Sequence, residues 1–343
     1  MNILIIGGTR FIGPPVVREL TAAGHRVAVF TRGTHPANLP EGVQHLTGDM
    51  NRLHETRAAF LAFQPDVVLH TMIITEAHAR ELMDIFQGIA ARVVMLSSMD
   101  VYRAYGRLIG LEPGPPEPVP YDEEAPLRAE RYPYRALAPG PEHPMYHYDK
   151  IPAEEIVMGD PYLPGTVLRL PMVIGPGDYQ HRLYMFLRPM VDGRPVIVMG
   201  EAYAAWRSTY GYVDNVAHAI ALACTDARAT RRVYNVGWPV ALSMQALGEK
   251  VGAAMQWAGV IVTVPEPELP PILQPDFDTR HHLVASTERI RTELGYTEPV
   301  DIDEGIRRTV AWELANPPDP LPEGAEDYYV AEDQLLRQLG KLP

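Results

Sequence analysis

Cysteine is almost absent from this sequence. Its 343 residues include one, Cys224, so no disulfide can form within the chain, which suits a reducing compartment. Cys224 lies in the apolar stretch AHAIALACTDA, where a buried structural thiol is favoured over a nucleophile. The cysteine content therefore predicts a cytoplasmic protein without covalent cross-links.

Long apolar runs and an excess of positive charge are also absent. No run approaches the length of a membrane-spanning helix, and the opening MNILIIGG has no basic leader and resembles a first β-strand. The 30 lysines and arginines are outnumbered by 43 aspartates and glutamates, which gives a formal net charge of -13. Because nucleic acids are bound by concentrated positive charge, we expect no nucleic-acid partner and no membrane association.

Short apolar runs rich in β-branched residues alternate with helix-like stretches in the first half of the chain. We expect strands at 2–6, 26–30, 43–46, 66–69, 92–96 and 166–170, with helices at 14–23 and 76–89 among the connections. Such strands are covered on both faces, and their alternation with helices forms a doubly wound sheet. The predicted fold class is α/β: a Rossmann-type doubly wound parallel sheet with a smaller C-terminal substrate-binding lobe.

The domain boundaries are predicted from the place where this alternation loosens. We expect a dinucleotide-binding Rossmann domain at 1–170 plus about 211–236, including a returning strand at 233–236. A substrate-binding lobe would comprise 171–210 and 237–316, followed by a C-terminal tail at 317–343. Within the first domain, the proline-rich segment 103–145 cannot be regular helix. It is either a surface excursion or a flap over the active site.

The first predicted strand runs directly into a glycine-rich loop, GGTRFIG, that opens a helix. Glycines in such a turn let the backbone approach a pyrophosphate, which the N–H groups at the helix start then hold. The alternative is a tight strand–helix turn without a ligand. We expect the cofactor to be contacted by Gly7, Thr9, Arg10, Phe11, Ile12 and Gly13.

Two arginines bear on which dinucleotide is bound. Arg10 stands where a middle glycine is usual, and the second predicted strand ends at Arg32 without an Asp or Glu to accept a ribose 2′-hydroxyl. Both arginines would favour a 2′-phosphate, so NADP is predicted over NAD, although Arg32 can equally be a solvated charge. Asp49, just past the third strand, is a candidate acceptor for the adenine amino group.

A tyrosine and a lysine four positions apart, Tyr146 and Lys150, would share one face of a helix. A neighbouring ammonium favours the phenolate form of a tyrosine, which suits proton transfer. Tyr148 competes for this role but has no lysine four residues onward. Ser98 follows an apolar run and would lie at the carboxyl end of a strand, where open α/β sheets bind ligands; its alternative role is a helix cap or turn serine.

The order of phosphate loop, strand-end serine and Tyr/Lys pair resembles the extended short-chain dehydrogenase/reductase (NAD-dependent epimerase/dehydratase) family. Further matching stretches are RLPMVIGPGD at 169–178, YVDNV at 212–216, YNVG at 234–237 and TERIRTELG at 287–295. The GGTRFIG form of the loop is similar to an atypical branch that also contains RNA-binding chloroplast proteins. By this resemblance Tyr146 is the acid/base, Lys150 its partner and Ser98 the orienting hydroxyl, and a homodimer is expected.

The resemblance also implies contacts beyond the loop and the triad. The additional cofactor contacts would be Met50, Thr71, Pro171 and Val173. Those with the substrate would be Ser98, Asp100, Tyr102, Arg207 and Tyr212.

Three positions depart from the family pattern. Dehydratases place an Asp-Glu pair after the catalytic hydroxyl, whereas Met99 and Asp100 follow Ser98; Met99 cannot act as an acid, and Asp100 is either a base or a capping residue. Residues 75–86 contain no Asn for the usual proton relay, and Pro171 stands where an Asn is usual after the sixth strand.

These observations predict an NAD(P)-dependent oxidoreductase or epimerase that acts on a hydroxyl or carbonyl substrate, with a nucleotide sugar as one candidate. The alternative is a non-catalytic dinucleotide-sensing or RNA-associated protein of the same fold. His143, His147 and His181 lack metal-ligand spacing, so no metal site is expected.

Overall fold

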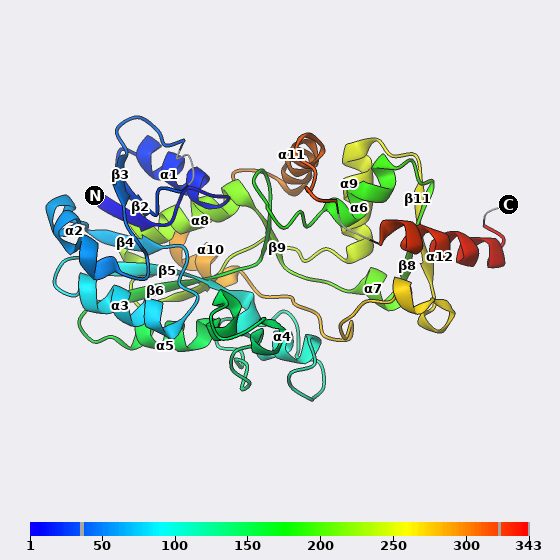
Figure 1. Cartoon of the computed structure of the whole chain (residues 1–343), viewed down its shortest axis with the longest axis horizontal. Coiled ribbons are helices and arrows are strands. Elements are labelled where there is room, and N and C mark those ends of the chain that lie inside the picture. Colours follow the sequence, from blue (N-terminus) through cyan, green and yellow to red (C-terminus); the bar gives the residue numbers. More distant parts are fainter. Residues whose placement is uncertain (35–37, 322–323, 342–343) are drawn as a thin grey trace.

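A seven-stranded parallel sheet forms the larger lobe of the protein (Figure 1). The structure, a computed structural model, describes residues 1–34, 38–321 and 324–341. The strands lie in the order β10-β6-β5-β4-β1-β2-β3, and every neighbouring pair is parallel. They are β1 (Asn2–Ile6), β2 (Arg26–Thr31), β3 (Gln44–Thr47), β4 (Val67–His70), β5 (Arg92–Ser98), β6 (Gly165–Leu170) and β10 (Val233–Asn235).

Helices cover both faces of this sheet. One face packs against α1 (Gly13–Ala22) and α8 (Val213–Thr225), and the other against α2 (Arg57–Phe63), α3 (Glu76–Phe86) and α5 (Lys150–Gly159). Alternating residues of β1 serve both cores: Ile3 and Ile5 pack on the first side, Leu4 and Ile6 on the second. The Rossmann-type doubly wound sheet is therefore confirmed.

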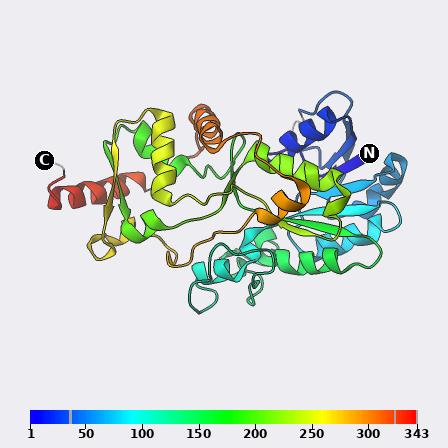
Figure 2. The same ribbon diagram turned by 180° about the vertical axis from the view of Figure 1, so that it is seen from behind.

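The strands agree with the sequence-based prediction to within two residues at either end, and a strand near 233 does return to the sheet as β10. The helix expected at 76–89 ends earlier, at Phe86, because Gly88 adopts a left-handed φ of 74° that an α-helix cannot contain. Seen from behind, the short helix α10 (Glu288–Leu294) lies beside β10 at the sheet edge (Figure 2).

A smaller lobe extends from the carboxyl side of the sheet (Figure 1). Two small parallel sheets, β11-β8 and β7-β9, supplement its helices. Its elements, with the strands that lead to it, are β7 (Met172–Ile174), α6 (Tyr184–Val191), β8 (Val196–Gly200), α7 (Glu201–Ala205), β9 (Tyr210–Tyr212), α9 (Met244–Met255), β11 (Val260–Val264), α11 (Ile302–Ala315) and α12 (Ala325–Gln338).

The region predicted as a C-terminal tail contains α12. Leu335 and Leu336 of this helix are buried against Val198 of β8 and Val264 of β11, so α12 completes the far end of the smaller lobe. The parts of the predicted tail at 322–323 and 342–343 lie outside the described residues. Within the described chain, none of the helices has the length and apolar character needed to traverse a bilayer.

The prediction that residues 103–145 contain no regular helix is wrong at their start, where α4 (Arg103–Leu108) forms ahead of the first proline, Pro113. The segment then follows an irregular path to Asp149, with two short 3₁₀ turns. It is not loose. Tyr121 exchanges backbone hydrogen bonds with Val284 and Ser286, and Arg128 donates its backbone N–H to Val101. These contacts hold the segment against the carboxyl edge of the sheet, where β1, β4 and β5 end next to one another.

Candidate active site

A crevice at the carboxyl ends of β1 and β2 contains the predicted dinucleotide site. A cavity of about 170 Å³ opens there. Its lining includes six of the residues predicted to bind the cofactor: Gly7, Thr9, Arg10, Arg32, Met50 and Thr71. The lining residues that the sequence reasoning missed are Gly8, Phe30, Thr31, Gly33, Thr34 and Met72.

The phosphate loop packs so closely that its glycines have no room for side chains. A Cβ on Gly13 would lie 2.2 Å from the Cα of Gly8, and one on Gly7 would lie 1.9 Å from the Oγ1 of Thr71. Gly7 also has a φ of 96°, which disfavours other residues. The narrow turn therefore fits the close backbone approach that a dinucleotide pyrophosphate requires.

The start of α1 limits which N–H groups can meet that pyrophosphate. Gly13 donates its N–H to the backbone oxygen of Arg10, and the two prolines that follow have no N–H. Phe11 and Ile12 directly precede the helix, so their N–H groups are the candidate donors. Phe11 adopts a φ of 42°, and its ring meets that of Tyr179 edge-on at 6.4 Å.

Two arginines border the end of the crevice where the adenosine is predicted to bind. Arg10 and Arg32 both border the cavity, together with Thr31 at the end of β2. Asp49, the predicted acceptor for the adenine amino group, is not among the lining residues; its Oδ1 accepts hydrogen bonds from the backbone N–H and the side chain of Asn51, at 2.9 and 3.0 Å. The position of Asp49 is thus explained by a local turn.

Ser98 and Asp100 lie where β5 ends. Ser98 is the last residue of the strand and caps the 3₁₀ turn Met99–Val101, since its Oγ accepts the N–H of Asp100 at 3.2 Å. Asp100 is buried, 8% exposed, and the structure gives its Oδ1 no hydrogen-bond partner among the described residues. Burial raises the pKa of Asp100, although hydrogen bonds and positive charges nearby oppose the rise.

Two tyrosines donate to the other oxygen of this carboxylate. Tyr148 reaches Oδ2 of Asp100 at 2.7 Å, and Tyr134 of the proline-rich segment reaches the same atom at 3.3 Å. Burial, followed by the charge of Asp100, raises the pKa of Tyr148, and a hydrogen bond with Ser98 acts in the opposite direction. Tyr134 thus brings the proline-rich segment into contact with the candidate site, and its role as a flap over an active site stays a prediction.

Tyr146 lies apart from this cluster. The expectation that a helix places it on one face with Lys150 is wrong, because α5 begins only at Lys150 and Tyr146 belongs to the preceding 3₁₀ turn Pro144–His147. Asp149 sets that start by accepting the N–H of Ile151 as an N-cap. The Tyr146 ring instead contacts the guanidinium of Arg135, 4.9 Å from the ring centroid.

Lys150 is buried beside the ends of β4 and β5. Its ammonium donates to the backbone oxygens of Ile73 and Leu96, the latter at 3.1 Å, and lies 5.8 Å from the ring centroid of Tyr148. Burial lowers the pKa of Lys150 to about 8, against the opposing effect of nearby carboxylates. Ser98, Tyr148 and Lys150 therefore gather at one sheet edge with Asp100.

A buried ion pair that no sequence pattern indicated supports this arrangement. Arg128, from the proline-rich segment, lies 3.2 Å from the carboxylate of Asp149, and both side chains are almost fully buried. The same guanidinium donates to the backbone oxygen of Asp100 at 2.6 Å, while Asp149 also accepts the N–H of Tyr132. One arginine therefore ties the segment to both Asp100 and the start of α5.

A second buried network fixes the strands behind the site. Glu154 of α5 pairs with Arg169 of β6 at 2.7 Å and accepts the hydroxyl of Ser97. Arg169 also donates to the hydroxyl of Tyr102 at 3.0 Å, and that hydroxyl donates to Asn235 of β10 at 2.7 Å. Tyr102 is only 1% exposed, so its predicted contact with the substrate is not supported. Its hydroxyl instead joins the buried hydrogen-bond network of Arg169 and Asn235.

The remaining predicted residues lie around the junction of the lobes. Pro171 packs against Gly211 and Gly237, and Val173 is buried. Arg207 is exposed. Tyr212 is 1% exposed, so its predicted role in substrate contact is likewise not supported.

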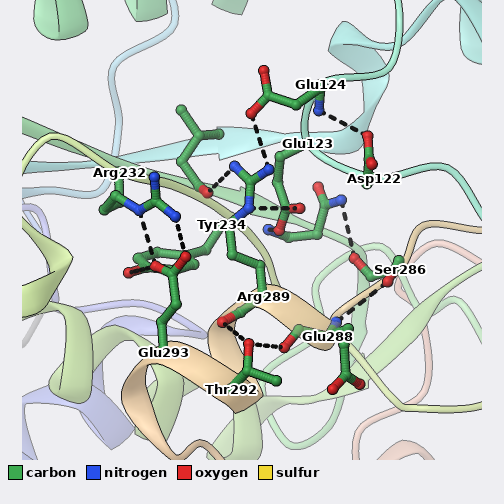
Figure 3. Close-up of polar contacts among 12 residues, drawn as sticks. Asp122, Glu123, Glu124, Arg232, Tyr234, Ser286, Glu288, Arg289, Thr292 and Glu293 are labelled. Carbon is green, nitrogen blue, oxygen red and sulfur yellow. Dashed lines mark hydrogen bonds and ion pairs between the residues drawn. The ribbon is translucent and has the colours of Figure 1, made fainter.

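Ionic contacts around α10 anchor the proline-rich segment from its other side (Figure 3). Arg289 of α10 lies 3.3 Å from buried Glu123 and donates to Glu124 at 2.9 Å. Glu123 also accepts the backbone N–H of Asn235 at 2.8 Å. Glu293, one turn further along α10, accepts from Tyr234 at 2.9 Å and pairs with Arg232. The segment is thereby joined to β10 and α10, far along the chain.

Comparison with known proteins finds relatives along most of the chain. Among curated relatives, a probable dTDP-glucose 4,6-dehydratase of Sinorhizobium fredii is 25% identical, covering 92% of this chain and 93% of its own. The chloroplast stem-loop binding protein of 41 kDa b of Arabidopsis thaliana is also 25% identical, covering 89% and 77%. Among solved structures, the UDP-glucose 4-epimerase of Thermus thermophilus in complex with NAD superimposes with a TM-score of 0.63 at 23% identity, covering 92% of this chain and all of that one.

The family model described as "NAD dependent epimerase/dehydratase family" matches residues 3–237. This range spans the phosphate loop, Ser98 at the end of β5, the start of α5 and the returning strand β10. Relatives that match this chain include dehydratases and reductases, so the prediction of an enzyme of the short-chain dehydrogenase/reductase type is confirmed. The chain belongs to the NAD dependent epimerase/dehydratase family.

Proposed function

We propose that this protein catalyses NAD(P)-dependent oxidation and reduction at a hydroxyl-bearing carbon of a nucleotide sugar. The observation that carries the proposal is the gathering of Ser98, Asp100, Tyr148 and Lys150 at the carboxyl ends of β4 and β5, on the same sheet edge as the dinucleotide crevice. Open α/β sheets bind ligands and carry out their chemistry at this edge.

The residues of the crevice fit a dinucleotide cofactor. The phosphate loop would hold the pyrophosphate at the start of α1, and Arg10 and Arg32 would meet the adenosine ribose. When bound, the nicotinamide ring supplies the hydride acceptor or donor. The chain's own residues then have to bind the sugar, orient its hydroxyl and move the hydroxyl proton.

Ser98 is suited to orient the reacting oxygen because its hydroxyl lies at the end of β5, where it is held by accepting the backbone N–H of Asp100. The buried ammonium of Lys150 lies close to Tyr148 and stabilises negative charge that develops there. Two tyrosines compete as the proton carrier: Tyr146 has the family spacing to Lys150, and Tyr148 has the contacts.

The two arginines support a preference for NADP. No acidic residue stands at the end of β2 to accept a ribose 2′-hydroxyl, whereas Arg10 and Arg32 carry the charge that a 2′-phosphate needs. Fluorescence titration with NADH and NADPH tests this directly. We expect tighter binding of NADPH, and this advantage should fall about tenfold in Arg32→Gln; equal affinities in the unaltered protein would contradict the preference.

The outcome that we favour is epimerisation or simple oxidoreduction rather than dehydration. Met99 occupies the position of the acid that would protonate a leaving hydroxyl, and no proton can come from its thioether. Dehydration would therefore lack an acid at this position.

Incubation of the purified protein with NAD or NADP and with UDP-glucose or dTDP-glucose tests the proposed reaction. Chromatography of the sugar products should reveal an epimer or an oxidised sugar, and Lys150→Met should lower the rate at least a hundredfold. A 4-keto-6-deoxy product would refute the exclusion of dehydration.

Arg207, exposed near the junction of the lobes, is our candidate clamp for the substrate diphosphate. A cytoplasmic homodimer remains the expected assembly.

RNA association is the second candidate, favoured by the similarity to a chloroplast stem-loop binding protein. The formal net charge of -13 argues against it. Filter binding with a structured RNA discriminates: retention that falls steeply with salt would support this function, and no retention at low salt would exclude it.

A further inference from the structure

Four side chains form a continuous hydrogen-bonded chain at the candidate site. Tyr148 donates to Asp100 Oδ2 at 2.7 Å, Tyr134 donates to the same oxygen at 3.3 Å, and the hydroxyls of Tyr134 and Tyr105 lie 2.8 Å apart. We call this the tyrosine–aspartate chain. It runs from the neighbourhood of Ser98 to Tyr105 of α4, which is partly exposed.

We propose that Tyr148 and Asp100 form the proton-transfer pair of this enzyme and that Tyr134 and Tyr105 relay the proton onward. The inference rests on the proposed function, because it assigns the proton step of that reaction. It replaces the tyrosine that motif spacing selects with one two residues later in the chain.

Local structure explains why the spacing misleads. Since α5 begins at Lys150, the residues before it are not α-helical, and Tyr148 has an extended backbone with ψ of 116°. Its side chain reaches Asp100, and its ring lies 5.8 Å from the Lys150 ammonium. The Tyr146 ring instead meets the His147 ring edge-on and lies beside the guanidinium of Arg135.

The usual relay through the lysine is also replaced. The Lys150 ammonium donates to two backbone oxygens, those of Ile73 and Leu96, and α3 contains no asparagine to continue a relay. Asp100 is the nearest group able to take a proton from Tyr148 directly. Its second oxygen, Oδ1, is buried and has no partner in the part of the chain that the structure describes, which leaves a site for a further proton donor.

The charges that face Asp100 suit a carboxylate that accepts protons. Arg128 and Lys150 approach as cations from the proline-rich segment and α5, while Tyr134 and Tyr148 approach as neutral donors. Burial raises the pKa of Asp100 and outweighs these stabilising contacts, so Asp100 is a stronger base than an exposed carboxylate. Arg128 donates to the backbone oxygen of Asp100 and forms its ion pair with Asp149.

In the oxidative direction, two coupled proton transfers accompany the removal of a hydride from the substrate carbon. The substrate hydroxyl gives its proton to Tyr148 Oη while the original phenol proton of Tyr148 passes to Asp100 Oδ2. An oxidised nicotinamide held in the dinucleotide crevice would accept the carbon-bound hydrogen with its electron pair, so that the carbinol would become a carbonyl. Reduction reverses each transfer, and Asp100 exchanges its proton through Tyr134 and Tyr105.

Single tyrosine substitutions separate the two assignments. We expect Tyr148→Phe to lower kcat for UDP-glucose or dTDP-glucose at least a hundredfold, with Tyr146→Phe within about threefold of the unaltered protein. Tyr162→Phe, at a tyrosine 78% exposed, controls for the loss of a surface hydroxyl. The reverse order of the first two effects would overturn the proposal.

The pH profile tests the role of Asp100. Oxidation requires Asp100 as the carboxylate, so kcat/KM should fall on the acid side as Asp100 becomes protonated. Asp100→Asn should lower kcat at least a hundredfold and abolish this acid limb, whereas a merely structural role would leave the shape of the profile unchanged. An unchanged acid limb in Asp100→Asn would contradict the proton-transfer pair. Tyr134→Phe should slow turnover severalfold without weakening substrate binding.

A titration without cofactor or substrate distinguishes failure of the pair from failure of the proposed reaction. Carboxyl-carbon NMR of aspartate-labelled protein follows Asp100, whose signal is identified by its loss in Asp100→Asn. The hydrogen bond from Tyr148 lowers the pKa of Asp100. Tyr148→Phe removes this bond and should raise the pKa of Asp100 further, whereas Tyr146→Phe should leave it unchanged. No difference between the two variants would overturn the pair. If the difference appears and neither sugar nucleotide reacts, the pair stands and the proposed substrate class is wrong.

Discussion

Lys150 carries a positive charge into the interior of the larger lobe, and its removal offers a quantitative test of the site. Lys150 is 6% exposed, and burial lowers its pKa from 10.5 to about 8, against the charges of Asp100 and Glu154. The folded protein is therefore less stable with this lysine charged than with it neutral. We predict that Lys150 makes the free energy of unfolding depend on pH in the alkaline range.

The sign and size follow from the pKa of Lys150 in the two states. Between pH 8 and pH 10.5 the unfolded chain still binds a proton that the folded protein has released, so the contribution of Lys150 to stability rises with pH. The lowering from 10.5 to about 8 corresponds to roughly 3 kcal/mol at about 1.36 kcal/mol per pH unit. About 2.5 kcal/mol of this falls between pH 7 and pH 10.

Urea denaturation followed by tryptophan fluorescence measures this effect in the unaltered protein and in Lys150→Met. Groups that titrate alike in both proteins cancel in the difference of their unfolding free energies. Between pH 7 and pH 10, we expect the unfolding free energy of the unaltered protein to rise by about 2.5 kcal/mol relative to that of Lys150→Met. Lys250→Met, at a lysine paired with exposed Asp303, is the matched control. A difference that stays flat over this range would refute the desolvation argument.

Two further predictions concern the buried ion pair and the phosphate loop. Arg128→Met should lower the unfolding free energy by about 3–5 kcal/mol, because it leaves the Asp149 carboxylate buried without its cation; Arg131→Met, in an exposed pair, should change it by less than about 1 kcal/mol, and urea denaturation compares them. Gly13→Ala should weaken NADPH binding at least tenfold in a fluorescence titration, because its Cβ would lie 2.2 Å from the facing loop backbone. Gly159→Ala, with open space around its Cβ, should bind as the unaltered protein does.

The central strands of the main sheet were predictable because nearly all of their residues are apolar and buried. Every residue of β1 from Ile3 to Ile6 is apolar and buried, so two-sided coverage follows from the residues alone. The smaller sheets were not predictable in this way. β9 has three residues, Tyr-Gly-Tyr, and Gly211 at its centre is placed by contacts with Pro171 and Val216, which no local period encodes.

At the candidate site, the sequence analysis selected Lys150 and Ser98, which both lie at the sheet edge. It also selected Tyr146, whereas the tyrosine that contacts Asp100 there is Tyr148. The spacing rule assumed that the helix had begun by Tyr146. Two signals argued for a later start: Asp149 is a favoured N-cap residue, and Pro152 fits only the first turn. The contacts of Tyr134 and Arg128 with Asp100 join residues roughly 30 positions apart, and such pairs leave no trace in a single sequence.

The anchoring of the proline-rich segment also sets an order of events during biosynthesis. Tyr121 pairs with the backbone at Val284 and Ser286, and Glu123 with Arg289. A ribosome must therefore extend the chain by more than 160 residues beyond Glu123 before these partners leave the exit tunnel. Six of the seven strands, β1 to β6, are therefore made before these distant anchors of the proline-rich segment exist. Until then the segment can be held at the sheet edge only by partners close in sequence, such as the Arg128 contacts with Asp100 and Asp149.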